Sequence, residues 1–125
     1  MDFLKKFDKW KDVEAHPAHT VIYPEGNPAD HLYVILSGEV ELSLRGNTLE
    51  VEKQGGLIGE MALFESAERS ATATARTDVK LARLDRDQLA GLMNESTEFS
   101  LQLMTVLANR LRAVNEFVAQ RLETA

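Results

Sequence analysis

The sequence contains no cysteine, no long apolar run and no excess of basic residues. Without cysteine the chain has neither disulfides nor thiolate metal ligands, so its 125 residues depend on an apolar core for stability. One domain of this length can bury such a core. No run is long enough to span a membrane, and residues 1–17 lack the apolar segment of a signal peptide. We therefore expect a soluble, cytoplasmic protein.

The formal net charge is −6, which opposes a phosphate backbone. We therefore expect no direct DNA binding and no membrane partner. The histidines, His16, His19 and His31, form no His-x-His metal pattern, and the sequence offers no Ser-His-Asp set or paired catalytic carboxylates. We expect no enzyme, no catalytic residue, no metal site and no cofactor apart from a ligand; a small metal-dependent β-barrel enzyme stays as an alternative.

Short segments with apolar residues at regular spacing make up the chain. Helical spacing of Phe3, Leu4, Phe7 and Trp10 predicts a helix over residues 2–12. After Pro17, residues 20–84 contain short β-rich runs separated by Gly, Pro, Asn and Asp turns, and we place the first strand there.

Two helices follow these strands. Asp85 is the expected N-cap of the first, and Ser96 or Thr97 that of the second, which runs to about Arg121. Strands followed by helices, without βαβ alternation, predict an α+β fold. We expect an antiparallel, jelly-roll-like β-roll with a short N-terminal helix and two C-terminal helices. This single domain, 1–125, divides into an N-terminal segment (1–19), the roll (20–84) and the C-terminal helices (86–122).

The last helix carries an apolar seam with spacings of three and four residues, as in a coiled coil. Its members are Met104, Leu107, Leu111, Val114 and Val118. The seam covers about two heptads, fewer than a coiled coil usually needs. Two interpretations stay open: the seam packs on the chain's own roll, or it pairs with a second copy in a homodimer.

Residues 58–75, IGEMALFESAERSATATA, combine groups that suit a phosphorylated ligand. Gly59 permits close approach of the backbone, and a helical turn over 60–65 would offer free amides to an anion. Arg69 brings a fork of donors for two phosphate oxygens, and Glu60 an acceptor for a ribose hydroxyl. The segment therefore indicates a pocket for a sugar phosphate or nucleotide. The alternative is an ion pair between Glu60 and Arg69 that ties a loop.

The same segment resembles the phosphate-binding cassette of the cyclic nucleotide-binding domain, F-G-E-[LIM]-A-L, a short loop and R-[SAT]-A-[TS]. Here the cassette occupies 58–73. The upstream YPEGNPADHLYVILSGEVELSL resembles the β-roll of that family, and the similarity runs from Val21 to Leu89. Short segments of this sequence are similar to those of catabolite activator-type regulators, which continue into a helix-turn-helix. This sequence stops at Ala125, so we expect a stand-alone sensor rather than a fragment.

The resemblance implies a role for each matching residue. Glu60 would accept from the ribose 2′-hydroxyl, and Arg69 would neutralise the cyclic phosphate. The other ligand-binding residues that it implies are backbone amides at Gly59, Met61 and Ala62, the hydroxyl of Ser70, and the pocket-lining Ile58 and Thr72. In the family the base is capped from the last helix, where the register places Arg110 and Asn115.

These observations predict a sensor that binds a cyclic nucleotide, cAMP rather than cGMP, and signals to an unknown partner protein through its C-terminal helix. Serine after the arginine favours guanine in some relatives, although catabolite activator-type proteins with this serine use cAMP. Glu68 replaces the usual proline before Arg69 and could compete for its charge. The alternative function is a nucleotide-independent interaction or dimerisation module that retains the fold.

Overall fold

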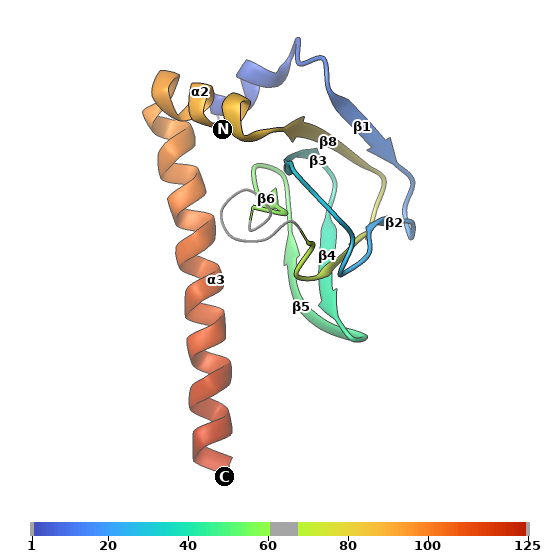
Figure 1. The fold of residues 1–125 in the computed structure, drawn as a ribbon, viewed down its shortest axis with the longest axis vertical. Coiled ribbons are helices and arrows are strands. Elements are labelled where there is room, and N and C mark those ends of the chain that lie inside the picture. The colour runs from blue at the N-terminus through green and yellow to red at the C-terminus, as the bar shows by residue number, and fades with distance from the viewer. Residues whose placement is uncertain (1, 61–67, 125) are drawn as a thin grey trace.

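The computed structural model describes residues 2–60 and 68–124, which form an antiparallel β-roll with helices along one side (Figure 1). The elements in chain order are η1 (Asp2–Phe7), β1 (Val13–His16), β2 (Val21–Tyr23), β3 (Leu32–Ser37), β4 (Val40–Leu44), β5 (Asn47–Glu52), β6 (Leu57–Ile58), β7 (Thr72–Ala75), β8 (Val79–Leu84), α2 (Arg86–Glu95) and α3 (Thr97–Thr124).

Two four-stranded sheets make the roll. The first has the order β1-β8-β3-β6 and the second the order β2-β7-β4-β5, with antiparallel pairing throughout. Apolar side chains from both sheets meet in a shared interior, to which the second sheet contributes Val40, Leu42 and Ala73. The α+β β-roll that the sequence predicts is therefore confirmed.

Strand β3 shows why its segment LYVIL is almost continuously apolar. Successive side chains of a strand point to opposite faces. Tyr33 and Ile35 pack in the interior between the sheets, whereas Leu32 and Val34 pack in a second core beneath the helices. Because both faces are covered, the strand needs apolar residues at consecutive positions.

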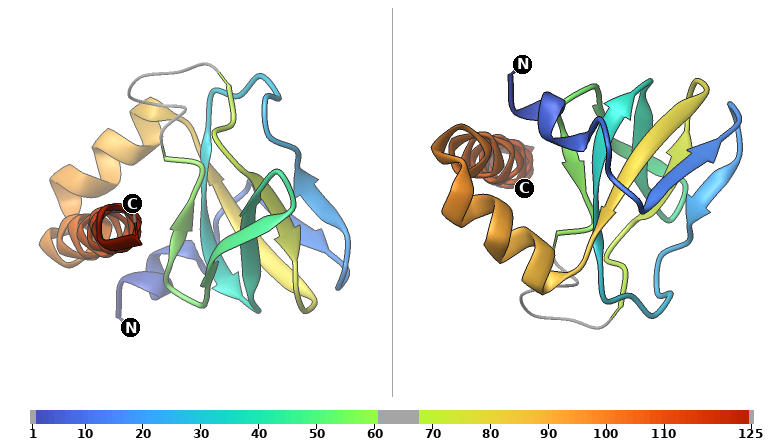
Figure 2. Two further views of the ribbon diagram at one scale, coloured as in Figure 1. Left: turned by 90° about the horizontal axis from the view of Figure 1, so that it is seen from below. Right: turned by 90° about the horizontal axis from the view of Figure 1, so that it is seen from above.

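The second core joins the first sheet to the helical layer. Its helical members are Phe3 and Phe7 of η1, Leu89 and Leu92 of α2, and Phe99, Leu103 and Val106 of α3. Figure 2 shows η1, α2 and the beginning of α3 gathered on this side of the roll. The layer therefore fixes where α3 starts its course along the sheet.

Side-chain caps set the starts of both helices at the predicted positions. The Asp85 carboxylate accepts from the Gln88 amide at 2.8 Å, and the Gln88 side chain accepts from the Asp85 amide at 2.9 Å, which completes a capping box. Ser96 Oγ accepts from the Phe99 amide at 3.1 Å. Each bond satisfies a backbone donor that a helix start leaves free.

The N-terminal segment differs from the prediction. The helix is a 3-10 helix that ends at Phe7, and residues 13–16 form β1, which pairs with β8. The Trp10 indole donates to the Arg83 carbonyl at 2.9 Å and so links the segment between η1 and β1 to β8. The free edge of β8 therefore overrides the helical spacing, because it supplies backbone partners that the sequence pattern does not reveal. His16 lies within the first strand and not before it.

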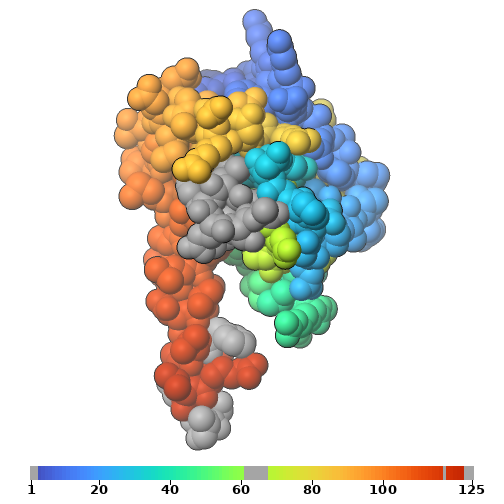
Figure 3. Space-filling view, in the orientation of Figure 1, coloured from blue at the N-terminus to red at the C-terminus, as the bar shows by residue number. Residues whose placement is uncertain are grey.

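The C-terminal part of α3 extends beyond the roll (Figures 1 and 3). Leu107 of the apolar seam contacts the second core, while Met104, Leu111, Val114 and Val118 are between 48% and 62% exposed. Packing on the chain's own roll therefore accounts for one member of the seam. The other four face away from it.

Candidate functional site

Two charged side chains are buried among the described residues, and both belong to the predicted cassette. Glu60 is 4% exposed and follows β6, whereas Arg69 is 5% exposed and precedes β7. A buried charge is costly unless other groups compensate it. The partners of these two side chains therefore define the chemistry of the site.

Arg69 is held by neutral groups. Its Nη1 donates to the carbonyl of His31 at 2.8 Å and to that of Gly59 at 3.2 Å, and its guanidinium lies 4.2 Å from the centre of the Tyr23 ring. Burial raises the pKa of Tyr23 to about 12, so this phenol stays neutral. Within residues 2–60 and 68–124 no carboxylate lies within 4 Å of the guanidinium, so no described carboxylate compensates its positive charge.

Gly59 makes room for this arginine. Its φ of +79° is a left-handed conformation that favours glycine, and a Cβ atom at this position would lie 2.3 Å from Arg69 Nη1. The glycine is therefore required both by the turn after β6 and by the close approach of the guanidinium.

Glu60 pairs with Arg110 from α3, not with Arg69. Arg110 Nη1 contacts Glu60 Oε1, and the same guanidinium reaches Glu50 and Glu52 on β5 and the carbonyl of Leu57. The alternative that Glu60 and Arg69 form a loop-tying ion pair is therefore wrong. Each buried charge of the cassette has its own set of partners.

The remaining predicted residues lie at different depths. Ile58 is fully buried in the interior of the roll, and Thr72 is half-buried with Oγ1 accepting from the Glu25 amide at 3.0 Å. Ser70 is exposed beside Arg69, and Asn115 is exposed on α3. Met61, Ala62 and the helical turn expected up to residue 65 lie outside the described residues.

The structure thus brings Gly59, Glu60, Arg69 and Arg110 together around the end of β6. Glu68 is exposed and its backbone forms a bridge with Pro28, whereas the neighbouring Arg69 is buried. Competition of Glu68 for the charge of Arg69 stays a prediction.

Sequence reasoning missed four contributors to the site: Tyr23, His31, Glu50 and Glu52. Tyr23 and the backbone of His31 hold Arg69, and no spacing rule connects them to residue 69. Glu50 and Glu52 carry a usable signal, because residues two apart on a strand share one face. A pair of acids on one face of β5 was therefore visible, although its partner on α3 was not.

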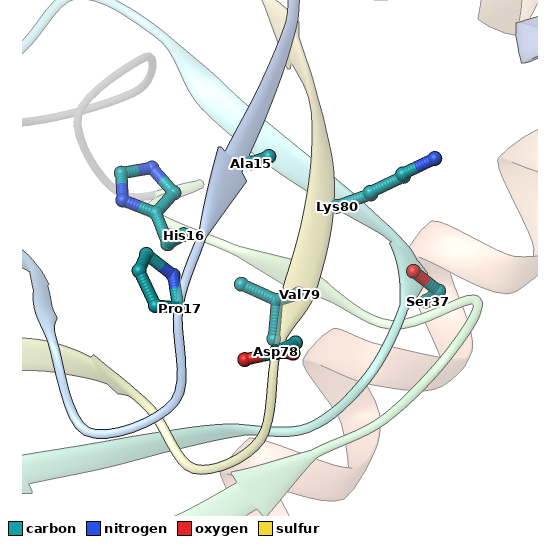
Figure 4. Close-up of a pocket in the computed structure, with 7 residues that line it drawn as sticks. All are labelled: Ala15, His16, Pro17, Ser37, Asp78, Val79 and Lys80. Atoms are coloured by element: carbon teal, nitrogen blue, oxygen red, sulfur yellow. The ribbon is translucent and has the colours of Figure 1, made fainter.

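A shallow hollow of about 340 Å³ lies elsewhere, where β1 ends beside β8. Its lining residues include His16, Asp78 and Lys80, and Figure 4 shows the His16 and Lys80 side chains pointing away from each other. Across the described ranges no group of three or more His, Asp or Glu side chains is arranged to hold a metal ion. Within the same ranges, no helix combines the length and the apolar character needed to cross a membrane.

The sequence similarity to known proteins extends over the whole β-roll. The profile of the cyclic nucleotide-binding domain matches residues 13–96. The CRP-like cAMP-activated global transcriptional regulator of Mycobacterium tuberculosis is 37% identical over 117 residues, which cover 90% of this chain and 52% of that protein. The cGMP-dependent protein kinase egl-4 of Caenorhabditis briggsae is 37% identical over 94 residues, which cover 68% of this chain and 12% of that protein.

The fold agrees with these sequence matches. The crystal structure of the catabolite activator protein of Thermus thermophilus superposes with a TM-score of 0.73 at 29% identity, over 95% of this chain and 57% of that chain. This chain spans about half the length of the CRP-like regulator that it matches. It belongs to the cyclic nucleotide-binding domain family.

Proposed function

We propose that this chain acts by binding a cyclic nucleotide, cAMP in preference to cGMP, and passes its bound state to a partner protein through α3. The observation that carries the proposal is Arg69, a buried cation with carbonyl and aromatic partners and no carboxylate among the described ones. Such a guanidinium gains most from a ligand that supplies an anion. The cyclic phosphate is that anion.

The ribose is assigned to Glu60. Arg110 contacts Oε1 of this carboxylate and orients it, and the second oxygen can accept from a 2′-hydroxyl. Arg69 donates to the carbonyl of Gly59, the residue directly before Glu60, so phosphate and ribose would lie on adjacent parts of one turn. Ser70 and Asn115, both exposed, are assigned to the phosphate edge and the base respectively.

The preference for cAMP rests on the matched relatives and on the residue that follows Arg69. The name of the bacterial relative describes activation by cAMP and that of the nematode kinase dependence on cGMP, and the bacterial match covers more of this chain. Ser70 follows Arg69 as in cAMP-using catabolite activator-type proteins.

The partner that α3 contacts includes a second copy of this chain. Four seam residues, Met104, Leu111, Val114 and Val118, are about half exposed or more, and apolar residues at this spacing pair readily with an identical helix. Sedimentation equilibrium tests this: the wild type should be a dimer, and Leu111→Glu with Val118→Glu a folded monomer. A monomeric wild type at high micromolar concentration would exclude the homodimer.

Calorimetric titration with cAMP and cGMP tests nucleotide binding. We expect Arg69→Lys, which keeps the charge but loses the fork, to weaken binding about tenfold, and Arg69→Ala to weaken it about 100-fold. If the wild type binds neither nucleotide at millimolar concentration, the alternative of a nucleotide-independent interaction module replaces the proposal. If binding occurs but leaves the amide exchange of α3 unchanged, signalling through α3 is wrong.

A further inference from the structure

The cluster around Arg110 contains more negative than positive charge. Arg110 Nε lies 2.5 Å from Glu50 Oε1, and Nη2 lies 3.6 Å from Glu52 Oε1, while Nη1 contacts Glu60. Among the described residues, three carboxylates thus converge on one guanidinium. If all of them were ionised, the cluster would carry two uncompensated negative charges.

The cluster is also shielded from water. The side chains of Arg110 and Glu52 are each 17% exposed, and that of Glu60 is 6% exposed. Like charges at such short range and in such shielding are costly, and the simplest relief is a proton held by one carboxylate. The geometry of the cluster therefore favours uptake of a proton.

Glu52 is the carboxylate best placed to take this proton. It is the most distant from the guanidinium, and its other oxygen lies so close to Gly56 that a Cβ atom there would be 2.3 Å from it. Glu50 lies two residues earlier on β5 and therefore on the same face of the strand, and two carboxylates can form a hydrogen bond when they share a proton. Burial, with the charges of Glu50 and Glu60 opposing that of Arg110, raises the pKa of Glu52 to about 7.

We propose that Glu50 and Glu52 are positioning residues of the nucleotide site: they hold Arg110, and with it α3, beside Glu60, and they do so most tightly when they share one proton. The inference rests on the proposed function in that it assigns Glu60 to the ribose. Since these acids hold the helix that would carry the signal, the protein would respond to pH and nucleotide together.

The sign of the pH effect follows from linkage. With α3 docked, burial raises the pKa of Glu52 to about 7. We expect that moving α3 away from the roll returns water to this carboxyl and lowers its pKa toward the ordinary range. The docked arrangement therefore binds a proton that the other releases, and docking weakens as the pH rises through 7. For one such group the docking equilibrium changes about tenfold between pH 6 and pH 8.

In the described part of the chain, the charged groups that face Glu52 are Glu50 on β5, Glu60 after β6 and Arg110 on α3. Tyr23 interacts electrostatically with both Glu60 and Arg110. Burial raises the pKa of Tyr23 to about 12, so its phenol stays neutral between pH 6 and pH 8. Neither Arg110 nor Tyr23 changes its charge between pH 6 and pH 8. The expected pH profile therefore belongs to the carboxylates.

Hydrogen exchange of α3 in the absence of nucleotide tests the inference. Protection factors of the α3 amides around residue 110, corrected for the intrinsic pH dependence of exchange, should be about tenfold higher at pH 6 than at pH 8. Glu52→Gln imitates the protonated acid, so its protection should stay high at both pH values, with less than twofold difference. Glu116→Gln removes an exposed carboxylate of α3 and should behave as the wild type does.

Nucleotide affinity, measured on the same proteins, is the second readout. Wild-type affinity should rise as the pH falls from 8 to 6, while that of Glu52→Gln should be flat. A wild-type α3 with equal protection at both pH values, or a Glu52→Gln variant that keeps the pH dependence, would overturn the inference even if nucleotide binds. Conversely, absence of nucleotide binding together with the expected exchange profile would overturn the proposed function and leave the role of these acids in holding α3.

Discussion

Two arginines flank the end of β6 and have opposite surroundings. Arg69 donates to the carbonyl of Gly59, and Arg110 donates to that of Leu57, two residues earlier. Both side chains are largely shielded from water. In the described part of the chain Arg69 has no carboxylate within 4 Å, whereas Arg110 contacts three.

This difference separates a site that can gain a ligand from one that joins two elements. An uncompensated guanidinium attracts an anion, which lowers the cost of its own burial. An arginine among excess carboxylates does not attract an anion, but its contacts join α3 to β5 and β6, and a proton on one of the acids would change the strength of that connection. Under the two proposals, one type of side chain would serve ligand binding at one end of the turn and coupling to α3 at the other.

Substitution of the two arginines by leucine should give the largest contrast. Removal of Arg110 leaves Glu50, Glu52 and Glu60 together without a cation, and loss of one partner from a buried ion pair typically costs about 3 kcal/mol. We therefore expect Arg110→Leu to lower the free energy of unfolding by about this amount at pH 8, measured by urea denaturation. At pH 6, where a carboxylate can be neutral, the loss should be smaller.

Arg69→Leu is the matched control. It leaves the carbonyls of His31 and Gly59 without this donor but leaves no described charge without its partner, so we expect a loss of about 1 kcal/mol that does not depend on pH in this range. Equal losses for both variants at pH 8 would show that the charge balance does not distinguish the two arginines.

A smaller effect is expected at Gly56, which lies against Glu52 of the Arg110 cluster, and Gly91 in α2 serves as its control. Alanine at Gly56 would place Cβ 2.3 Å from Glu52 Oε2 and 3.0 Å from the Lys53 carbonyl. We expect a loss of about 2 kcal/mol in unfolding free energy, in the range of other overpacked sites. Adding Glu52→Ala should recover part of it, because the closer of the two clashes disappears.

Gly91→Ala is the control for the glycine substitution itself. Apart from the backbone of α2 itself, no atom of the described residues lies within 4 Å of a Cβ at this position, so alanine should stabilise the protein by about 1 kcal/mol through helix propensity. If Gly56→Ala is as harmless as Gly91→Ala, then Glu52 is not confined beneath Gly56.

The sequence alone predicts much of the fold and the two charged residues of the cassette, Glu60 and Arg69. The alternation of Val40 and Leu42, and the cap residues Asp85 and Ser96, depend on neighbours within a few positions, so they can be read locally. The cassette is also local, since Glu60 and Arg69 are nine positions apart in the printed sequence. Such features follow directly from residue type and spacing.

The contact partners of the cassette residues and of Arg110 could not be predicted from local sequence. Arg110 and Glu50 are 60 residues apart, and the contact depends on the angle at which α3 crosses the roll. Similarly, the β1 strand forms because the edge of β8 is available, and its own sequence contains no strong signal. Long-range pairing therefore decides which of the two arginines meets the acids, and with it the charge balance around each of them.

The smallest expected effect concerns the aromatic face beneath Arg69. The guanidinium lies 4.2 Å from the centre of the Tyr23 ring, a cation–π contact that contributes about 1 kcal/mol at a shielded site, or about fivefold in affinity. Tyr23→Leu should therefore weaken cAMP binding about fivefold in calorimetric titration, whereas Tyr23→Phe, which keeps the ring, should change it less than twofold. Arg110 has no such contact among those described, so neither variant should alter the pH profile of α3 exchange. If Tyr23→Phe weakens binding as much as Tyr23→Leu, the hydroxyl and not the ring supports Arg69, and the neutral surroundings of this arginine would have to be attributed to a hydrogen-bonding group.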